Sequence, residues 1–302
     1  MPKAIKLTKL ATTYDCIVFH YDVRLLMIFW LLYCVRYLSK PNDRIVFTTF
    51  LNDVSSFTRF PLLSKGWIRE KLRFIYYFIF TRMAKVIVVH SSAEIDIYAK
   101  AFQLPRDRFE FIPYFVRRDA LNSNQQNISL PIAQYILAAG RQRDFQTFIS
   151  AMRDTPFQGV IVAGQEDREV LLQKDIPANI ETHFEIPFEE YRALIAGATV
   201  FVVPLFADRV IRSLGQIATF EAVAHHIPVI ASRTFQLTDY FTSDIEILFF
   251  QPENSNELRR QIERIMRDKP LKEELTQRAY SRMLSQYTDE QYTQSLLQLC
   301  GR

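Results

Sequence analysis

The sequence predicts an α/β protein whose strands form parallel sheets, divided into two domains. The length of 302 residues is about twice the roughly 150 residues of an average domain. Apolar residues make up 49% of the chain and the formal net charge is only +4, which is typical of folded rather than disordered chains. In the second half, short apolar runs alternate with segments of helical periodicity, a pattern typical of a parallel sheet with helices on both faces.

The elements of the second half follow from this alternation. Apolar runs of strand length occupy residues 135–139, 159–163, 200–204, 228–231 and 247–250. Helical spacing of apolar residues occurs at 145–152, 188–196 and 216–224. Beyond Pro252 we expect further helices, the first with a polar cap at Ser255 or Asn256, and with interruptions at Pro270 and near Asp289.

The first half shows the same alternation with fewer strands. Residues 16–20, 45–49 and 86–90 have the pattern of strands, and the aromatic-rich stretches 23–38 and 68–83 have helical spacing. Three strands in about 115 residues predict a reduced Rossmann-like domain.

The charge distribution places the domain boundary. Residues 1–118 carry 19 Lys and Arg against 9 Asp and Glu, a net charge of +10, and residues 119–302 carry 18 against 24, a net charge of −6. The change coincides with Arg117 and Arg118, directly before the polar stretch 121–131, whose composition is typical of a linker. We therefore predict an amino-terminal domain at 1–118 and a carboxyl-terminal domain at 119–302.

Cysteine usage and absent motifs narrow the classes of function. The three cysteines make an odd number without metal-type spacing, so we expect no disulfide framework, no metal site and a reducing, cytoplasmic location. The longest apolar run, 25–35, is too short for a transmembrane helix, and we identify no secretory signal. The P-loop, dinucleotide-binding and zinc-hydrolase motifs are absent. No nucleic-acid-binding module is recognisable, so we expect no nucleic-acid partner.

A candidate phosphate site lies in the segment 200–233, where a strand is followed by a loop and a helix. Ser213 is placed to cap the helix, and Gly215 permits a ligand to approach the backbone closely. Unpaired amides of the first turn present partial positive charge to an anion, over Ser213, Leu214, Gly215 and Gln216. Glu221 follows about a turn later, where its carboxylate can accept hydrogen bonds from sugar hydroxyls. The alternative is an ordinary capped amphipathic helix with a surface glutamate.

A second candidate site follows the strand that ends at Gly140. Arg141 and Arg143 come next, before a helix that buries Phe145 and Phe148. Open α/β sheets bind ligands at the carboxyl ends of their strands, and two guanidinium groups there suit the oxygens of a diphosphate. The alternative is a pair of solvated loop arginines.

Together the two segments resemble the retaining glycosyltransferase family 4. The matching residues are Phe220-Glu221-Ala222-Val223-Ala224 with Ile227-Pro228-Val229-Ile230-Ala231, and, about 70 residues earlier, Gly140-Arg141 with Arg143-Asp144. The resemblance implies the GT-B fold of two Rossmann-like domains, here with a reduced first domain. It implies that Glu221 binds the donor ribose, and that the donor diphosphate is bound by Gly140, Arg141, Arg143, Ser213, Leu214, Gly215 and Gln216.

Two residues depart from the family pattern. Ser213 stands where the family has an acid that contacts the donor sugar. His226 stands where the family generally has glycine, so we expect Ala224-His225-His226 to be a helix end that reaches the left-handed conformation rather than a catalytic pair.

Further segments extend the resemblance over about residues 85–300. Gly164 ends a strand in the family's manner, and the stretch 185–204 looks like the next strand, turn and helix. The turn at Ile186, Pro187 and Phe188 is implied to line the base of the nucleotide. The resemblance further implies a nucleotide-diphosphate sugar as donor, no other cofactor, retention of anomeric configuration, and a lipid-linked or polysaccharide acceptor. It assigns no catalytic residue.

The basic first half resembles the family only loosely. The family's glycine-rich opening loop is missing, because the first glycine is Gly66. His20 and Asn52-Asp53, at strand ends, are candidates to replace its polar groups, or are ordinary loop residues. The segment from Lys65 to Lys85 carries six Lys and Arg against one Glu among many aromatic residues. This favours peripheral contact with an anionic membrane about as much as a core helix with basic ends.

The expected function is therefore a metal-independent glycosyltransferase of the hexosyltransferase type, in polysaccharide biosynthesis, located in the cytoplasm or on the inner face of the membrane. The alternative is a non-catalytic subunit or scaffold that binds nucleotide but transfers no sugar, because Ser213 replaces the family acid and the first domain is short.

Overall fold

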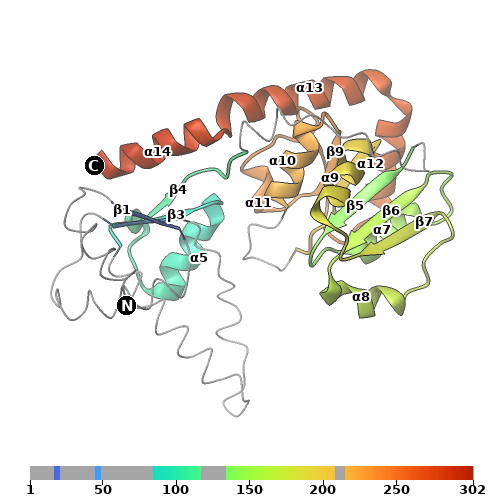
Figure 1. Ribbon diagram of the computed structural model, residues 1–302, viewed down its shortest axis with the longest axis horizontal. Helices are drawn as coiled ribbons and strands as arrows, with labels where there is room; N and C mark the ends of the chain where they lie inside the picture. The colour runs from blue at the N-terminus through green and yellow to red at the C-terminus, as the bar shows by residue number, and fades with distance from the viewer. Residues whose placement is uncertain (1–16, 21–44, 49–83, 117–133, 208–214, 302) are drawn as a thin grey trace, which may run out of the picture. The chain divides into compact units, whose positions relative to one another are not determined.

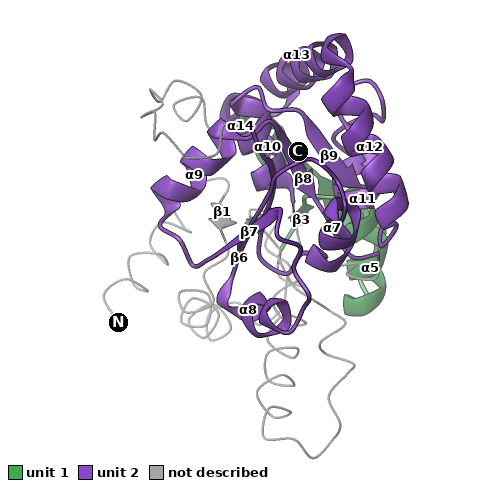
Figure 2. Ribbon diagram, turned by 90° about the vertical axis from the view of Figure 1, so that its right-hand side faces the viewer, with its two compact units in different colours: residues 1–113, 210–213, 292–302 green, residues 114–209, 214–291 purple. Residues whose placement is uncertain are grey.

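The computed structural model describes residues 17–20, 45–48, 84–116, 134–207 and 215–301. The chain forms two compact units, coloured separately in Figure 2. Unit 2 comprises Tyr114–Arg209 and Leu214–Gln291, and unit 1 comprises Met1–Pro113, Val210–Ser213 and Tyr292–Arg302. The carboxyl-terminal residues thus cluster with unit 1, whereas the sequence pattern assigns everything after residue 118 to one domain.

Unit 2 is built on a parallel sheet of six strands in the order β10-β9-β8-β5-β6-β7 (Figure 1). These strands are β5 (Ile136–Gly140), β6 (Gly159–Ala163), β7 (Ile180–Phe184), β8 (Val200–Val203), β9 (Val229–Ser232) and β10 (Leu248–Phe250). The five apolar runs predicted as strands in the second half are found within a residue or two of their expected bounds. The strand expected at the start of the stretch 185–204 lies earlier, because β7 already ends at Phe184.

Helices bury both faces of this sheet. On one face α7 (Phe145–Met152) and α12 (Ser255–Arg267) pack against each other and against Ile136 and Ala138 of β5. Leu137 points the opposite way in the same strand and is equally buried. The other helices of unit 2 are α8 (Gln165–Leu172), α9 (Phe188–Gly197), α10 (Gln216–Ala224), α11 (Phe235–Thr238) and α13 (Lys269–Gln286). The predicted pattern of a parallel sheet between helices is therefore confirmed.

The first two helices after Pro252, α12 and α13, begin at polar caps. Asn254 caps α12, since its side-chain oxygen accepts a hydrogen bond from the Glu257 amide at 3.0 Å. The predicted cap at Ser255 or Asn256 is therefore wrong, because those residues already belong to the helix. Asp268 ends α12 and caps α13, with Pro270 in the first turn, where a missing amide costs no hydrogen bond. The last helix, α14 (Asp289–Gly301), begins at the predicted residue.

The described part of unit 1 contains a smaller parallel sheet in the order β1-β2-β3-β4. Its strands are β1 (Ile17–His20), β2 (Ile45–Thr48), β3 (Val86–Val89) and β4 (Phe109–Phe111), with α5 (Ser92–Phe102) and a short 3₁₀ helix, η1 (Arg106–Arg108), between β3 and β4. Three of these strands are predicted and are confirmed, whereas β4 is not predicted. The expected helices at 23–38 and 68–83 lie outside the described residues.

Two further expectations concern cysteine and the membrane. The expectation of no disulfide framework did not foresee a bonded cysteine, but Cys300, at the end of α14, is disulfide-bonded. Among the helices of the described ranges, none combines the length and the hydropathy needed to cross a membrane.

Candidate functional site

The loops that carry the candidate residues meet at one point of the unit 2 sheet. β5 is the first strand of this sheet, and the chain continues through β6 and β7 on one side of it and through β8, β9 and β10 on the other. β5 therefore pairs with β6 and with β8, and Ala138 lies opposite both Ile161 and Val202. In open parallel sheets, ligands bind at the carboxyl ends of the strands where the strand order reverses in this way.

Gly140 and Arg143 lie together at the end of β5. The φ angle of Gly140 is +127°, and a Cβ atom at this position would come within 2.7 Å of Nε of Arg143. The Arg143 side chain is thus folded back onto the strand, where Nε donates a long hydrogen bond of 3.4 Å to the Ala139 carbonyl oxygen. A side chain at position 140 would occupy the space of the Arg143 guanidinium. Glycine at this position therefore makes room for the guanidinium.

Arg143 is a buried cation with an unsatisfied donor. The residue is 7% exposed, and among the described residues its Nη1 has no hydrogen-bond partner. Burial lowers the pKa of Arg143 to about 10, against the smaller opposing effects of Tyr191 and Asp167, so the group still carries its charge at neutral pH. A charged, buried donor without a partner is costly unless a ligand satisfies it, which makes Arg143 the strongest anion-binding candidate of the site.

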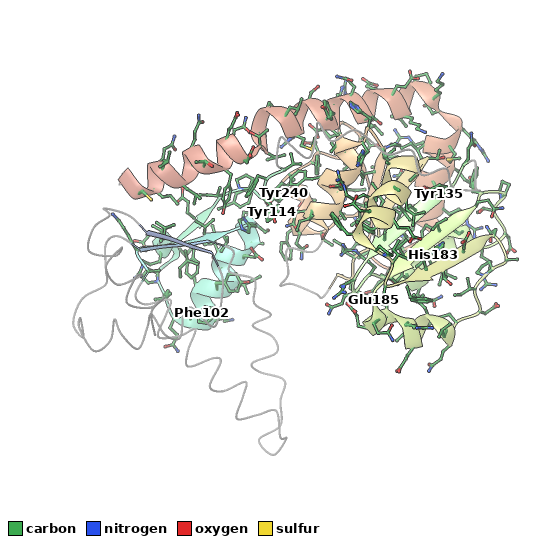
Figure 3. All side chains as sticks on the ribbon, viewed as in Figure 1. Phe102, Tyr114, Tyr135, His183, Glu185 and Tyr240 are labelled. Atoms are coloured by element: carbon green, nitrogen blue, oxygen red, sulfur yellow. The ribbon has the colours of Figure 1, made fainter. Side chains whose placement is uncertain are left out.

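Arg141 is placed differently. Its side chain is 67% exposed and pairs with Glu185 at 3.4 Å and with Glu166 at 4.0 Å. Glu185 directly follows β7 and is labelled in Figure 3. The two arginines predicted to bind the diphosphate therefore have different surroundings. Arg143 is buried beside β5, and Arg141 faces acidic residues that follow β6 and β7.

A cavity of about 260 Å³ brings several predicted residues together. Its lining comes from the carboxyl ends of β5 and β6, from the segments that follow β5, β6 and β7, and from α9. The lining residues are Gly140, Arg141, Val162, Ala163, Gly164, Glu185, Ile186, Phe188 and Tyr191. Pro187, the remaining predicted base-lining residue, is the N-cap of α9 and lies between Ile186 and Phe188 in the chain. Small-molecule sites usually measure roughly 300–1,000 Å³, so this cavity is the right size for part of a nucleotide sugar.

The cavity is bordered by an aromatic pair. The Phe188 and Tyr191 rings are stacked with their centroids 6.4 Å apart. Phe188 is 66% exposed, which is unusual for a ring of this size and leaves one of its surfaces available to a planar ligand.

The helix α10 begins beside the carboxyl end of β8. Gly215 is its N-cap, with a φ angle of +103°, and a Cβ atom there would contact Val203 and Leu205 at 3.2 and 3.3 Å. The expectation that Ser213 caps this helix is therefore wrong, because the helix starts at Gln216. Ser213 and Leu214 themselves lie outside the described residues.

Gln216 is the second residue of the site with unsatisfied polar atoms. Its side chain is buried, at 1% exposure, and neither Nε2 nor Oε1 has a hydrogen-bond partner in the part of the chain that the structure describes. A buried carboxamide without partners is uncommon in folded proteins. Arg143 and Gln216 both stand next to the chain that leaves β8: the Asp144 amide donates to the Pro204 carbonyl, and Gly215 packs against Leu205.

Glu221 lies further along α10 and is engaged on one oxygen. Arg192 Nε donates to its Oε1 at 2.6 Å, and His225 Nε2 lies 3.3 Å from the same atom. Burial acts to raise the pKa of the Glu221 carboxyl, but hydrogen bonds from His225 and Arg192 outweigh it and hold the pKa below its ordinary value. Tyr191, which lines the cavity, is within electrostatic range of both Arg143 and Glu221, so these groups belong to one neighbourhood.

The expectation for the end of α10 is confirmed. His225 is the C-cap, and His226 has a φ angle of +56°, the left-handed conformation that the family reaches with glycine. The His226 ring packs against Tyr280 with a centroid distance of 4.1 Å. Its role in the structure is therefore to end the helix.

Sequence reasoning missed Tyr191, Arg192 and Glu185. Tyr191 and Arg192 belong to α9, and only the packing of α9 against α10 brings them to Glu221. A usable signal was available for Glu185, since an acid directly before the predicted base-lining turn is placed to reach the site. The other candidates, His20 and Asn52-Asp53, cannot be assessed: Asn52 and Asp53 lie outside the described residues, and only the backbone of His20 is described, at the end of β1.

Metal ligands were not expected. In the part of the chain that the structure describes, no three or more His, Cys, Asp or Glu side chains are grouped so as to hold a metal ion. Metal independence stays a prediction.

Similar solved structures share the fold of this chain. Sucrose-phosphate synthase from Thermosynechococcus elongatus is 21% identical, with a TM-score of 0.71, over 98% of this chain and 75% of that one. Anabaena HepE in complex with UDP is 15% identical, with a TM-score of 0.69, over 99% and 81%. WaaG, a glycosyltransferase involved in lipopolysaccharide biosynthesis, is 14% identical, with a TM-score of 0.66, over 95% and 86%. These similarities confirm the predicted fold class, α/β with two Rossmann-like domains of the GT-B type.

The family is shown by sequence. No curated protein matches the chain. Residues 141–298, more than half of the 302 residues, match the family model described as glycosyl transferase-like. That match begins at Arg141 and includes the cavity, α10 and Glu221. The chain therefore belongs to the glycosyl transferase-like family.

Proposed function

We propose that this protein transfers a sugar from a nucleotide-diphosphate donor to an acceptor, with retention of anomeric configuration and without a metal ion, as in glycosyltransferase family 4. The family and the fold support a transferase. The observation that carries the finer proposal is Arg143: a buried, charged guanidinium with an unsatisfied donor, at the point where the strand order reverses.

The parts of the donor are assigned to separate parts of the site. The base is held in the cavity beside Gly164, Ile186, Pro187 and Phe188, and the ribose binds Glu221. Arg143 and the first turn of α10 hold the diphosphate, with Gly140, Arg141, Ser213, Leu214, Gly215 and Gln216. Anabaena HepE, which shares the fold, has been solved with UDP and with UDP-glucose, and this supports a nucleotide sugar as the ligand.

The chemistry follows from where charge develops. When the bond between the anomeric carbon and the diphosphate breaks, its electron pair goes to the phosphate oxygen. The acceptor hydroxyl forms the new bond to the anomeric carbon, and its proton goes to that phosphate oxygen. Donors that are already in place for that oxygen stabilise the transition state without reorganisation. The Arg143 guanidinium and the free amides of α10 are such donors, because the first is fixed by burial and the others by the helix.

Kinetics of Arg143 variants test this assignment. Arg143→Met keeps much of the side-chain volume and removes the charge, and we expect donor turnover to fall about 10²–10³-fold, the loss usual for one such donor. Arg143→Lys should retain part of the activity. Arg153→Met is the matched control, because Arg153 pairs with Asp175 on the surface at 2.9 Å and follows the end of α7 that points away from the site. Near-normal turnover in both Arg143→Met and Glu221→Ala would reject the assignment.

Metal independence is tested separately. Turnover of the purified protein should be unchanged after treatment with a chelator, and added divalent ions should not raise it. Loss of activity on chelation with recovery on metal addition would contradict this part of the proposal.

A second candidate function is a non-catalytic subunit that binds nucleotide and transfers no sugar. It is favoured by Ser213, which stands where the resembling family has an acid on the donor sugar. Thermal shift with UDP, GDP and ADP and their sugars, followed by a donor-hydrolysis assay, separates the two. Binding without hydrolysis or transfer would favour the subunit.

The acceptor side of the proposal rests on sequence. We infer a lipid-linked or polysaccharide acceptor, at the inner face of the cytoplasmic membrane, from the resemblance and from the basic, aromatic segment between Lys65 and Lys85. Most of that segment lies outside the described residues. Co-sedimentation with vesicles containing anionic lipid, compared with neutral vesicles, tests the membrane contact.

A further inference from the structure

The Glu221 carboxylate is held from two sides through one oxygen. Arg192, on α9, donates from Nε to Oε1 at 2.6 Å, and His225, four residues along α10, places Nε2 at 3.3 Å from the same oxygen. Both donors come from structured elements, one a packed helix and the other a helix cap. The orientation of the carboxylate is therefore set before any ligand arrives.

The second oxygen is left open. Among the described residues, no hydrogen bond or ion pair uses Oε2 of Glu221. The Glu221 side chain remains 18% exposed, so it is not sealed in the core. An ionised carboxylate has about four acceptor positions, two on each oxygen. Oε1 thus accepts hydrogen bonds from the protein, and Oε2 keeps its full capacity to accept hydrogen bonds from a ligand.

The open oxygen belongs to the neighbourhood of the cavity. Arg192 directly follows Tyr191, which lines the cavity, and Tyr191 is within electrostatic range of Glu221 and of Arg143. A charged acceptor in the same neighbourhood as a cavity and an anion-binding guanidinium is matched by a ligand that offers neutral hydroxyl donors next to phosphate. Ribose, with adjacent 2′ and 3′ hydroxyls, has this chemistry, and 2′-deoxyribose offers one hydroxyl fewer.

We propose that Arg192 and His225 are positioning residues which fix Oε1 of Glu221 and present Oε2 to the ribose hydroxyls, so that the donor is a ribonucleotide sugar rather than a 2′-deoxyribonucleotide sugar. This rests on the proposed function, because it assigns the ribose to Glu221. Fixing the carboxylate in advance removes the side-chain ordering that ligand binding would otherwise have to overcome. The competing interpretation is that Arg192 and Glu221 form an ion pair that only joins α9 to α10.

A binding cycle between protein variants and nucleotide analogues separates these interpretations. Titration calorimetry is performed with UDP, GDP and ADP, and the tightest binder is then compared with its 2′-deoxy analogue. For the unaltered protein we expect the 2′-deoxy analogue to bind about tenfold or more weakly, which is the effect of one hydrogen bond to a charged group. Glu221→Gln should largely remove this difference.

The decisive variant is Arg192→Met. We expect it to weaken the ribonucleotide about tenfold and the 2′-deoxy analogue clearly less, because the analogue keeps only one of the two hydroxyls that Oε2 accepts. Arg192→Lys should restore part of the preference, and His225→Phe should reduce it less than Arg192→Met, since the His225 contact is longer. Arg153→Met, which also breaks a surface ion pair, should leave both affinities unchanged.

The outcomes that overturn the inference differ from those that overturn the proposed function. If Arg192→Met and Arg192→Lys weaken both nucleotides equally, or leave both unchanged, Arg192 has no positioning role, and the nucleotide site survives. If the unaltered protein binds none of the nucleoside diphosphates, the proposed function itself is wrong. Melting temperatures of the variants are measured in parallel, and the Arg192→Lys result stands if Arg192→Met fails to fold.

Discussion

At the scale of single residues, Gly140 and Arg143 act as one unit. The guanidinium occupies the space where residue 140 would carry a side chain, and the φ angle of +127° is one that other residues rarely adopt. The close approach explains why a glycine stands at the end of β5 in a chain with only seven glycines. The sequence motif pairs Gly140 with Arg141. In the structure, however, Gly140 makes room for the side chain of Arg143.

Gly140→Ala should therefore disturb the anion site more than the fold. The added methyl group meets Nε of Arg143 at 2.7 Å, so the guanidinium has to move away from the strand. We expect nucleotide affinity to fall at least about tenfold, with a loss of roughly 1–3 kcal/mol in stability from the strained backbone. Titration calorimetry and thermal unfolding measure the two effects.

Gly301→Ala is the control for this substitution, because a Cβ atom there meets nothing within 4 Å. It should leave nucleotide binding unchanged. Normal nucleotide affinity in Gly140→Ala would contradict the role given to Arg143.

The pKa of Glu221 leads to a prediction about pH. Because hydrogen bonds from His225 and Arg192 hold this pKa below that of an ordinary glutamate, against burial, folding favours the charged form. Its contribution to stability is therefore complete above the ordinary pKa of ~4.3 and is lost as the pH falls through the lower value of the folded state. The difference in unfolding free energy between the unaltered protein and Glu221→Gln should be constant from pH 8 to about 5 and shrink below ~4.3.

Urea unfolding of both proteins across this pH range measures the difference, in which groups common to both cancel. A difference that disappears already near pH 6 would show that the carboxyl pKa is raised rather than lowered. A difference that persists unchanged to about pH 3 would show that the ion pair contributes nothing through its charge.

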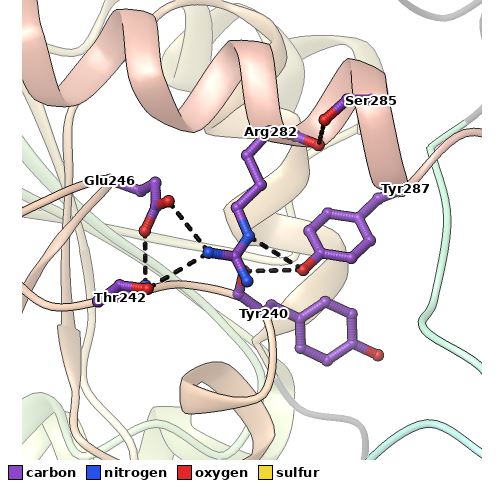
Figure 4. A network of polar contacts seen from close by, with 6 residues as sticks. All are labelled: Tyr240, Thr242, Glu246, Arg282, Ser285 and Tyr287. Atoms are coloured by element: carbon purple, nitrogen blue, oxygen red, sulfur yellow. Dashed lines mark hydrogen bonds and ion pairs between the residues drawn. The ribbon is translucent and has the colours of Figure 1, made fainter.

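At the scale of elements, an aromatic cluster holds α10 in place. Phe220, next to Glu221, contacts the Tyr240, Phe241 and Tyr287 rings with centroid distances of 5.6, 6.0 and 5.4 Å. Figure 4 shows Tyr240 and Tyr287 beside Arg282, which also binds Glu246 at 3.0 Å. The helix that carries the ribose-binding candidate thus packs through Phe220 against a cluster of aromatic rings.

Phe220→Ala tests this anchoring. Removing a fully buried ring costs about 3–5 kcal/mol, which for a unit of this size lowers the melting temperature by roughly 10 °C. Phe188→Ala is the matched control, since Phe188 is largely exposed, and its melting temperature should stay within about 2 °C of that of the unaltered protein. Equal shifts for the two variants, measured by calorimetry, would remove the argument that Phe220 anchors α10.

The elements that sequence predicted and those it missed differ in burial. Strands β5, β6 and β8 are buried along their whole length or nearly so, and their unbroken apolar runs are sufficient to locate them. β7 buries only Ile180 and has polar residues from Glu181 to His183, and β4 has three residues with a glutamate in the middle. A search for apolar runs does not detect such short or half-exposed strands, so these two elements required the structure.

The residues of the site also divide into those that the sequence predicts and those that it does not. Gly140, Arg141, Gly164, Ile186 and Phe188 could be predicted because each is fixed by its place at the end of a strand or in the following turn, and the cavity brings them together. Arg192 could not, because its partner Glu221 is 29 residues away on another helix. Nor does sequence distinguish the buried Arg143 from the exposed Arg141, since that depends on the conformation of Gly140.

At the scale of the whole molecule, the chain enters and leaves unit 2 at adjacent points. Val116 pairs with Thr288 in a parallel bridge, and the Val116 amide donates to the Tyr287 carbonyl at 2.8 Å. The Tyr114 amide donates to the Tyr240 hydroxyl at 2.8 Å, which connects the entering segment to the aromatic cluster. Tyr240 and Tyr287, which belong to the network in Figure 4, therefore connect the two ends of unit 2 with α10.

The central claim is that one nucleoside diphosphate is bound where the loops after β5, β6, β7 and β8 meet. The most direct measurement is a crystal structure of the full chain with the tightest-binding nucleoside diphosphate. The account predicts phosphate oxygens within hydrogen-bond distance of Arg143 and of the first turn of α10, the ribose at Oε2 of Glu221, and the base beside Ile186 and Phe188. A nucleotide bound elsewhere, with Arg143 and Gln216 still unsatisfied, would contradict it.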